Sequence, residues 1–270
     1  MSLYNDGLPA GVQFGRPLLF LETMYLTSTT SLLYDAALAL FYPQACAVCG
    51  ASVEARFDGL ACASCWQETR RFTGDETVCW KCGALSLGSI SQDKREQVRC
   101  RRCDAEPFAA ARACGLYEGA LRASIIALKR EPHVAGRLLH LLAEASRRAP
   151  IENATRIVPV PLHPERERAR GFNQAAVLAH ALSRVTRLPV DEWSLARIVH
   201  TELHRVGMDE RARRESVENA FAAQHPRLIE GERILLIDDV FTTGATVSAC
   251  AVVLKEAGAE EVFVLTIARV

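Results

Sequence analysis

The sequence lacks three features that would each point to a class of function. Its 32 lysine and arginine residues balance 32 aspartate and glutamate residues, so any nucleic-acid face must be local. No uninterrupted apolar run reaches the length of a membrane-spanning helix. The N-terminus lacks the basic segment of a secretory signal, and we therefore expect a cytoplasmic protein. The length of 270 residues predicts one large domain or two modest ones.

Aromatic residues are also scarce, at 7% of the chain, which leaves little material for stacking the bases of a single strand. One cluster, Trp66, Phe72 and Trp80, lies among cysteine pairs and fits either a small core or a stacking surface. Residues 1–44 form a lead of weak periodicity. Within it, the apolar spacing of residues 31–42 predicts a short amphipathic helix that Pro43 ends.

Cysteine, by contrast, is abundant. Eight of the ten cysteines form four Cys-x-x-Cys pairs, which in a reducing compartment favour metal binding over disulfides. Two such pairs complete one tetrahedral four-cysteine site, so the sequence predicts two structural zinc ions with no open coordination position. Sequential and interleaved pairing both remain open. The predicted ligands are Cys46, Cys49, Cys62, Cys65, Cys79, Cys82, Cys100 and Cys103.

Basic residues accompany the second half of these cysteines. Lys81, Arg99, Arg101 and Arg102 lie beside predicted ligands. They can offset the two excess negative charges of each four-thiolate site, or they can face a nucleic-acid backbone. The two remaining cysteines, Cys114 and Cys250, lie in apolar contexts that predict burial.

One stretch near the C-terminus organises the rest of the chain. Four consecutive aliphatic residues, 234–237, predict a strand buried on both faces of a parallel sheet. Asp238 and Asp239 follow where we expect that strand to end, which is where ligands bind in open α/β sheets. A threonine- and glycine-rich loop then opens into an apolar helix, predicted over 247–255, and provides a phosphate cradle. Its candidate phosphate-binding residues are Thr242, Thr243, Gly244, Ala245 and Thr246.

Two carboxylates beside a phosphate cradle indicate a ligand that also carries hydroxyl groups, because an ionised carboxylate can only accept hydrogen bonds. A ribose 5-phosphate meets both requirements. The stretch resembles the phosphoribosyl-pyrophosphate (PRPP) motif of the type I phosphoribosyltransferases. That resemblance implies that Asp238 and Asp239 hold the ribose during catalysis, and that PRPP binds together with Mg²⁺.

Two further segments carry a more specific resemblance. Tyr117, Gly119, Leu121, Leu128 and Lys129 match the entry to the phosphoribosyltransferase domain of the ComF family. The segment from Val158 to Pro164, followed by three alternating arginines and a Gly-Phe-Asn-Gln sequence, matches the signature of the same family. The resemblance implies that Lys129, Arg168 and Arg170 contact pyrophosphate, although alternating charges also fit a solvated surface.

The resemblance spans roughly residues 40–270 and predicts the organisation of the chain. We expect an α/β protein with a type I phosphoribosyltransferase fold, a parallel sheet flanked by helices, preceded by a small four-cysteine zinc-ribbon domain. The expected units are the lead over 1–44, a double zinc ribbon over 45–106, and a phosphoribosyltransferase-like domain over 112–270. Beyond Glu106 the composition turns aliphatic and helical, with helices predicted over 120–129 and 136–148.

The family resemblance implies a role in natural competence and in handling incoming single-stranded DNA, with other DNA-uptake proteins as partners. Two classes of function therefore stay open. In one, the pocket binds PRPP within a DNA-uptake factor without turnover. In the other, an active transferase moves the phosphoribosyl group of PRPP onto a small acceptor and releases pyrophosphate.

The segment between Leu188 and Gly231 departs from the family pattern. His204 stands where the family usually has glutamine, and Ser216 stands near a usual asparagine. Since this region commonly supplies the cover over the site in phosphoribosyltransferases, the departures leave the acceptor unidentified.

Overall fold

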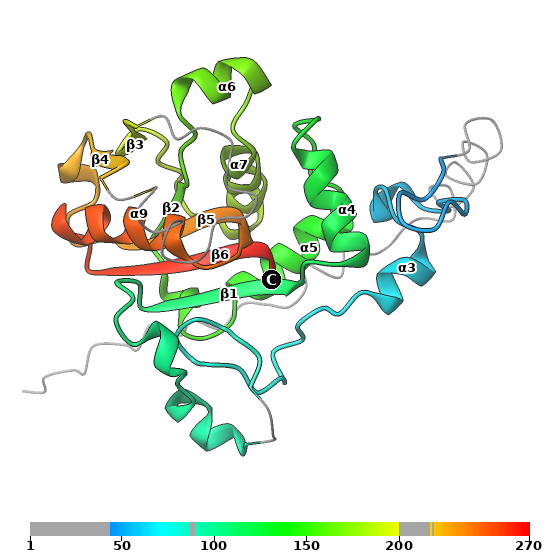
Figure 1. Ribbon diagram of the computed structural model, residues 1–270, viewed down its shortest axis with the longest axis horizontal. Coiled ribbons are helices and arrows are strands. Elements are labelled where there is room, and N and C mark those ends of the chain that lie inside the picture. The colour runs from blue at the N-terminus through cyan, green and yellow to red at the C-terminus, as the bar shows by residue number, and fades with distance from the viewer. Residues whose placement is uncertain (1–43, 87–89, 200–216, 218) are drawn as a thin grey trace, which may run out of the picture.

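The computed structural model describes residues 44–86, 90–199, 217 and 219–270 (Figure 1). The amphipathic helix predicted over 31–42 lies outside these residues. So do His204 and Ser216. Among the residues described, no helix is both long and apolar enough to cross a membrane.

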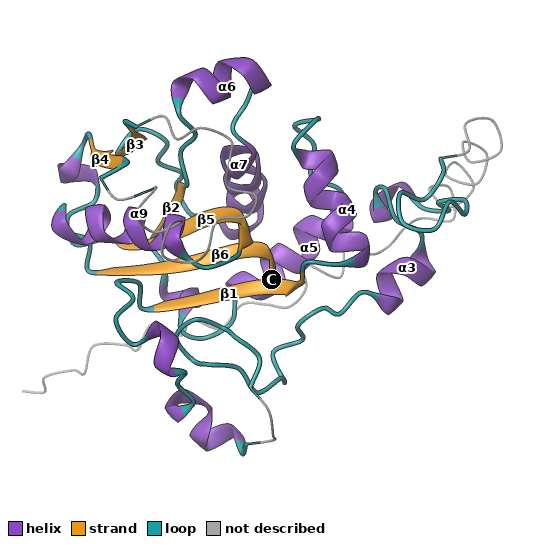
Figure 2. Cartoon of the chain, viewed as in Figure 1, coloured by secondary structure: helices purple, strands orange, loops and turns teal. Residues whose placement is uncertain are grey.

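A four-stranded parallel sheet forms the centre of the molecule, in the order β1-β6-β5-β2 (Figures 1 and 2). The two inner strands, β5 (Arg233–Phe241) and β6 (Glu261–Arg269), are aliphatic and buried, as a strand covered on both faces requires. The outer strands are β1 (Ala110–Leu116) and β2 (Arg156–Pro159).

Helices cover both faces of this sheet, and the alternation of side chains along β5 explains how. Leu235 and Ile237 belong to one core cluster, with α4 (Gly119–Leu128), α5 (Gly136–Ser146) and α7 (Gln174–Thr186). Ile234 and Leu236 belong to a second cluster, with α9 (Ala245–Glu256). The predicted fold class is therefore confirmed: a parallel sheet flanked by helices.

Two elements differ from the sequence prediction, and the sequence predicted no helix or strand for the segment that forms a third. The strand that carries the acidic pair does not end before Asp238, because its ladder with β6 continues through Phe241. β1 lies in a segment that the composition indicated as helical. The alternating charges form a short helix, α6 (Pro164–Arg170), which begins with a proline, carries glutamates in its first turn and arginines in its last, and ends at Gly171.

Smaller elements complete the fold. Strands β3 (Leu195–Arg197) and β4 (Phe221–Ala223) form a separate antiparallel pair on the α9 side of the sheet. Two short 3-10 helices are η4 (Ile151–Asn153) and η5 (Pro226–Leu228). The cysteine-rich region contains α3 (Ala63–Glu68) and the 3-10 helices η1 (Arg56–Asp58), η2 (Gln92–Gln97) and η3 (Arg101–Cys103).

The cysteine-rich region runs along the outer edge of β1. The backbone N–H of Phe72 donates to Cys114 O at 2.7 Å, and Leu116 N–H donates to Arg70 O at 2.9 Å. Nearer the start of the strand, Ala111 N–H donates to Lys81 O at 2.6 Å. The ribbon segment therefore lies against the sheet as an additional, irregular edge.

Candidate functional site

The loop between β5 and α9 has the backbone shape of an anion cradle. Gly244 caps the start of α9 with a φ of 83°, which side-chain-bearing residues rarely adopt. A Cβ at this position would lie 2.8 Å from the ring of Phe241. Both constraints require glycine here, and they fix the backbone conformation of the loop at the start of α9.

The same loop carries unused hydrogen-bond donors. Within the described part of the chain, the backbone N–H groups of Thr242, Thr243 and Gly244 donate to no protein group. They directly precede the first turn of α9, where the helix dipole favours negative charge. Thr242 is exposed, and Thr243 Oγ1 accepts a weak bond from Ala245 N–H at 3.4 Å. The loop therefore offers three free donors to an anion.

The acidic pair lies at the end of the sheet next to this loop, and the two carboxyl groups differ. Asp239 is buried, and its Oδ2 lies 3.0 Å from Lys129 Nζ at the end of α4. Asp238 accepts a hydrogen bond from Asp239 N–H at 2.8 Å. Removal from water, followed by the neighbouring Asp239 charge, raises the pKa of Asp238 to about 8. One carboxyl group therefore has a cation partner and the other favours its protonated form.

The predicted pyrophosphate residues fall into two groups. Lys129 lies beside the acidic pair, as its ion pair with Asp239 shows. Arg168 and Arg170 lie on α6, which follows the carboxyl end of β2. This is the end of the sheet at which β5 carries the acidic pair, because β2 and β5 are parallel. Arg168 is exposed, and Arg170 donates to the Gln174 side chain. Within the described residues, neither arginine forms a hydrogen bond or ion pair with the 242–244 loop.

The eight predicted zinc ligands gather into two groups of four, in sequential order. The first group contains Cys46, Cys49, Cys62 and Cys65. The second group contains Cys79, Cys82, Cys100 and Cys103. Interleaved pairing is therefore excluded.

The spacing of the sulfur atoms fits tetrahedral zinc. A Zn–S length of about 2.3 Å gives a tetrahedron with edges of roughly 3.8 Å. In the first group, Sγ–Sγ distances are 3.8 Å for Cys46–Cys65 and 3.7 Å for Cys49–Cys62. In the second group they are 3.4 Å for Cys79–Cys103 and 3.6 Å for Cys82–Cys100. Each group therefore fits a structural four-cysteine site.

The thiol groups within each cluster differ in acidity. Although burial opposes it, backbone N–H donors lower the pKa of Cys46 to about 6 and that of Cys79 to about 7. Burial, together with the neighbouring Cys79 and Cys100 sulfurs, raises the pKa of Cys82 to about 11. Four clustered thiolates repel one another, and a divalent cation at their centre would remove that repulsion.

The second cysteine cluster borders the anion loop. A cavity of about 110 Å³ is lined by Cys82, Cys100 and Cys103 on one side and by Phe241, Thr242 and Thr243 on the other. Arg269 Nη1 donates to Cys82 O at 2.6 Å, and its guanidinium lies 5.3 Å from the ring centre of Phe241. Arg269 and Phe241 therefore link the cluster to the loop. Sequence reasoning missed both, because a terminal arginine and a phenylalanine after an acidic pair carry no distinctive pattern.

Comparisons with known proteins agree with this division of the chain. Residues 37–116 match a family described as double zinc ribbon domain, and residues 171–270 match the phosphoribosyl transferase domain family. The fold and the site therefore define a double zinc ribbon joined to a phosphoribosyltransferase fold.

Three named relatives show the family to which the chain belongs. The DNA utilization protein YhgH of Escherichia coli K12 is 32% identical over 216 residues, which cover 77% of this chain and 89% of that protein. Competence protein F of Haemophilus influenzae is 36% identical over 135 residues, 49% of this chain and 58% of that protein. Competence protein ComFC of Bacillus subtilis is 39% identical over 102 residues, 38% of this chain and 39% of its own. The chain belongs to the ComF family, as the sequence analysis predicted.

A solved structure of a glutamine PRPP amidotransferase from B. subtilis matches more weakly. It shares 19% identity at a TM-score of 0.35, and the match covers 53% of this chain and 30% of that one. A likeness of this strength adds nothing to the assignment.

Proposed function

We propose that the chain binds PRPP at the segment from Asp238 to Thr246. The observation that carries the proposal is the run of three unused N–H donors over 242–244, held by the left-handed Gly244 at the start of α9. A phosphate group at this position would receive these donors and the positive end of the helix dipole.

The acidic pair supplies the complementary requirement of a sugar. Ribose hydroxyls donate to carboxylate oxygens, which needs Asp238 ionised and Asp239 released in part from Lys129. The negative phosphates of PRPP would attract Lys129 Nζ away from Asp239, and the Mg²⁺ that accompanies PRPP would favour the ionised form of Asp238. Lys129 would then contact the pyrophosphate, and Arg168 and Arg170 on α6 would approach it from the neighbouring strand. Mg²⁺, bound together with PRPP, would neutralise part of the pyrophosphate charge.

We further propose that each cysteine cluster binds one structural zinc ion and that the chain acts in handling incoming single-stranded DNA in the cytoplasm. The four-sulfur geometry supports the first proposal. The names of the competence and DNA-utilization relatives support the second. Other DNA-uptake proteins are the expected partners. The expected domain bounds of 45–106 and 112–270 remain part of this proposal.

Calorimetric titration with PRPP and Mg²⁺ tests the binding site. The Gly244→Val variant should bind PRPP at least about tenfold more weakly, because the new side chain meets Phe241 and distorts the donors. Gly231→Val is the matched control: Gly231 has a φ of 72°, and a Cβ there meets nothing within 4 Å. Equal affinities in the two variants would place the PRPP site elsewhere.

The salt dependence of single-strand binding tests the DNA role. Arg99 and Arg101 are exposed on the ribbon, whereas Arg102 lines the cavity beside Thr242 and is left unchanged. Replacing Arg99 and Arg101 with alanine should reduce the slope of log affinity against log salt by about 0.7 per contact, with PRPP affinity unaltered. Salt-independent binding by the parent protein, together with pyrophosphate release from PRPP in the presence of a small acceptor, would favour the transferase instead.

A further inference from the structure

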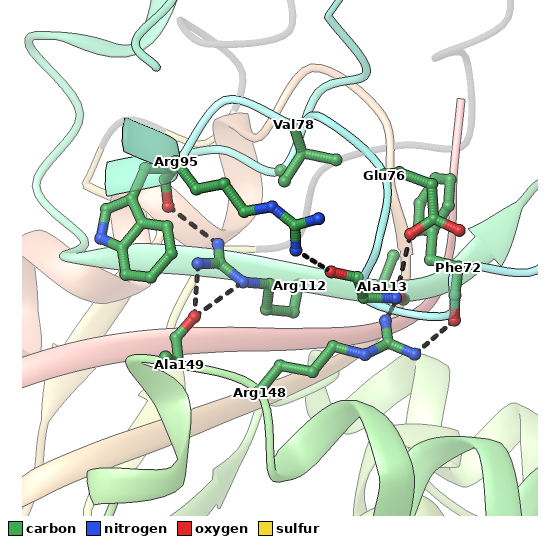
Figure 3. Close-up of a pocket in the computed structure, with 11 residues that line it drawn as sticks. Phe72, Glu76, Val78, Arg95, Arg112, Ala113, Arg148 and Ala149 are labelled. Atoms are coloured by element: carbon green, nitrogen blue, oxygen red, sulfur yellow. Dashed lines mark hydrogen bonds between the residues drawn. The ribbon is translucent and has the colours of Figure 1, made fainter. Parts of the chain in front are cut away.

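A second pocket, separate from the PRPP site, lies between the ribbon and the start of the sheet (Figure 3). Its volume is about 260 Å³. Arginines from three different segments line it: Arg95 from η2, Arg112 from β1 and Arg148 from the turn after α5. Phe72, Val78 and Trp80 of the ribbon supply its apolar wall.

The charge of this pocket is not balanced from within. Glu76 is the acidic residue among those lining it, so three guanidinium groups and one carboxylate leave a surplus of two positive charges. Although burial opposes it, N–H donors of Thr73 and Gly74 lower the pKa of Glu76, so this carboxylate stays ionised. Arg112 is only 7% exposed, and burial together with the nearby Arg148 lowers its pKa to about 10.

The hydrogen bonds of the three arginines go to backbone carbonyl groups. Arg112 donates to the carbonyls of Trp80, Ala111 and Ala149, Arg148 to Phe72 and Ala113, and Arg95 to Gly74 and Asp75. These bonds hold the guanidinium planes in place without neutralising their charge.

Donors remain available on two of the three groups. A guanidinium carries five N–H donors. Arg112 makes four bonds, whereas Arg95 and Arg148 make two each. The Nε atom of Arg95 is buried and has no hydrogen-bond partner among the described residues. An unpaired donor buried beside unbalanced positive charge is costly unless an anion occupies the site.

We propose that this pocket binds a small phosphomonoester with a flat or apolar organic part. A phosphomonoester is a dianion above a pKa of about 6, which matches the surplus of two charges better than a carboxylate does. Its phosphate oxygens accept from the free donors of Arg95 and Arg148, while Arg112 contributes charge from behind. The organic part packs against Phe72, Val78 and Trp80. The site is distinct from the one proposed for PRPP and goes beyond that function.

Titration of the full chain with adenosine 5′-monophosphate and with phenyl phosphate tests the assignment. Arg95→Gln should weaken binding of both by about tenfold or more, since charged hydrogen bonds are lost. Lys94→Gln is the matched control, because Lys94 is the exposed neighbour on η2, lies outside the pocket and loses the same charge. Thermal melts of both variants monitor folding.

A second arm separates this pocket from the PRPP site. In the Gly244→Val protein, binding of the two probes should persist while PRPP binding is lost. Inorganic phosphate should bind more weakly than phenyl phosphate, because it lacks the apolar part. The proposal is overturned if neither probe binds at millimolar concentration, if Lys94→Gln weakens binding as much as Arg95→Gln, or if Gly244→Val abolishes it.

Discussion

The two cysteine clusters have the same local construction but different surroundings. In each, the first cysteine of the leading pair is buried and its N–H donates to a carbonyl five residues later, Cys46 to Ala51 and Cys79 to Ala84. A left-handed glycine follows each pair, Gly50 with a φ of 80° and Gly83 with a φ of 69°. The two clusters therefore share the same local backbone geometry. The differences between them arise from the parts of the domain that each cluster contacts.

The first cluster packs on the helical layer. Arg137 on α5 forms an ion pair with the buried Asp58 and lies 6.0 Å from the ring centre of Trp66. Thr69 Oγ1 accepts a bond from Ala120 N–H at 2.9 Å and so holds the start of α4. The second cluster instead contacts the anion loop through Arg269 and the shared cavity with Thr242 and Thr243. One cluster thus packs against the fold, while the other also borders the loop proposed to bind PRPP.

The largest expected difference comes from removing one zinc ligand at matched positions. Cys46→Ser and Cys79→Ser should each reduce the metal content to about one zinc ion per chain. Only Cys79→Ser should also weaken PRPP binding by tenfold or more, because the wall beside Thr242 and Thr243 loosens. Metal analysis and calorimetry on the same samples give both numbers. Equal losses of PRPP affinity in the two variants would contradict the assigned difference.

A pH titration of stability is the next test, because the raised carboxyl group lies on the strand that ends beside the second cluster. An unfolded aspartate has a pKa near 3.9, whereas that of Asp238 is about 8 in the folded chain. The folded state therefore binds more protons between these values, and stability should fall as pH rises through this window. A shift of this size corresponds to a change of at most about 5 kcal/mol, which denaturant unfolding at several pH values measures.

Asp238→Asn should abolish that component of the pH dependence. Asp104→Asn serves as the control, since Asp104 is exposed and, within the described residues, only its backbone carbonyl accepts a bond, from Lys81. A pH profile for Asp238→Asn that matches the parent would show that another group titrates in this window.

The smallest expected effect comes from replacing the arginines that attach each cluster to the domain, Arg137 for the first cluster and Arg269 for the second. Arg137→Met and Arg269→Met should each cost about 1.5–3 kcal/mol of unfolding free energy, the range for a hydrogen bond to a charged group. Arg269→Met should additionally lower PRPP affinity, because Arg269 contacts both Cys82 and Phe241. Chemical denaturation and PRPP titration of the two variants provide the comparison. A loss of PRPP affinity confined to Arg137→Met would reverse it.

Sequence patterns predicted the parts of the fold where a single physical preference dominates. The inner strand β5, predicted from residues 234–237, is a run of β-branched and aliphatic residues, which few other structures accommodate. Gly244, between the acidic pair and an apolar helix, indicated the loop over 242–244, because glycine alone readily adopts the left-handed backbone that such a loop needs. The cysteine pairs predicted the two clusters, but their sequential order needed the structure, since either pairing satisfies the spacing.

The parts that were missed depend on tertiary contacts. β1 reads Ala-Ala-Arg-Ala-Cys-Gly-Leu, a composition that suits a helix, yet a Cβ at Gly115 would collide with the backbone at Arg70. The close approach of the ribbon backbone at Arg70 therefore requires a residue without a side chain at Gly115. Buried Arg112 also gave no signal, because its carbonyl partners come from Trp80 and Ala149, far away in sequence.

The position of the ribbon against β1 has a consequence for the behaviour of the chain in solution. An outer strand with free N–H and C=O groups is a template for intermolecular pairing and aggregation. At one edge of this sheet, Arg70, Phe72 and Lys81 form backbone hydrogen bonds with β1. At the other edge, Ile157 of β2 donates to Pro189 O and accepts from Asp191 N–H. The metal-binding segment therefore acts as a shield for the sheet edge. A fragment beginning near residue 112 would expose β1 and be prone to self-association, even with every predicted PRPP contact intact.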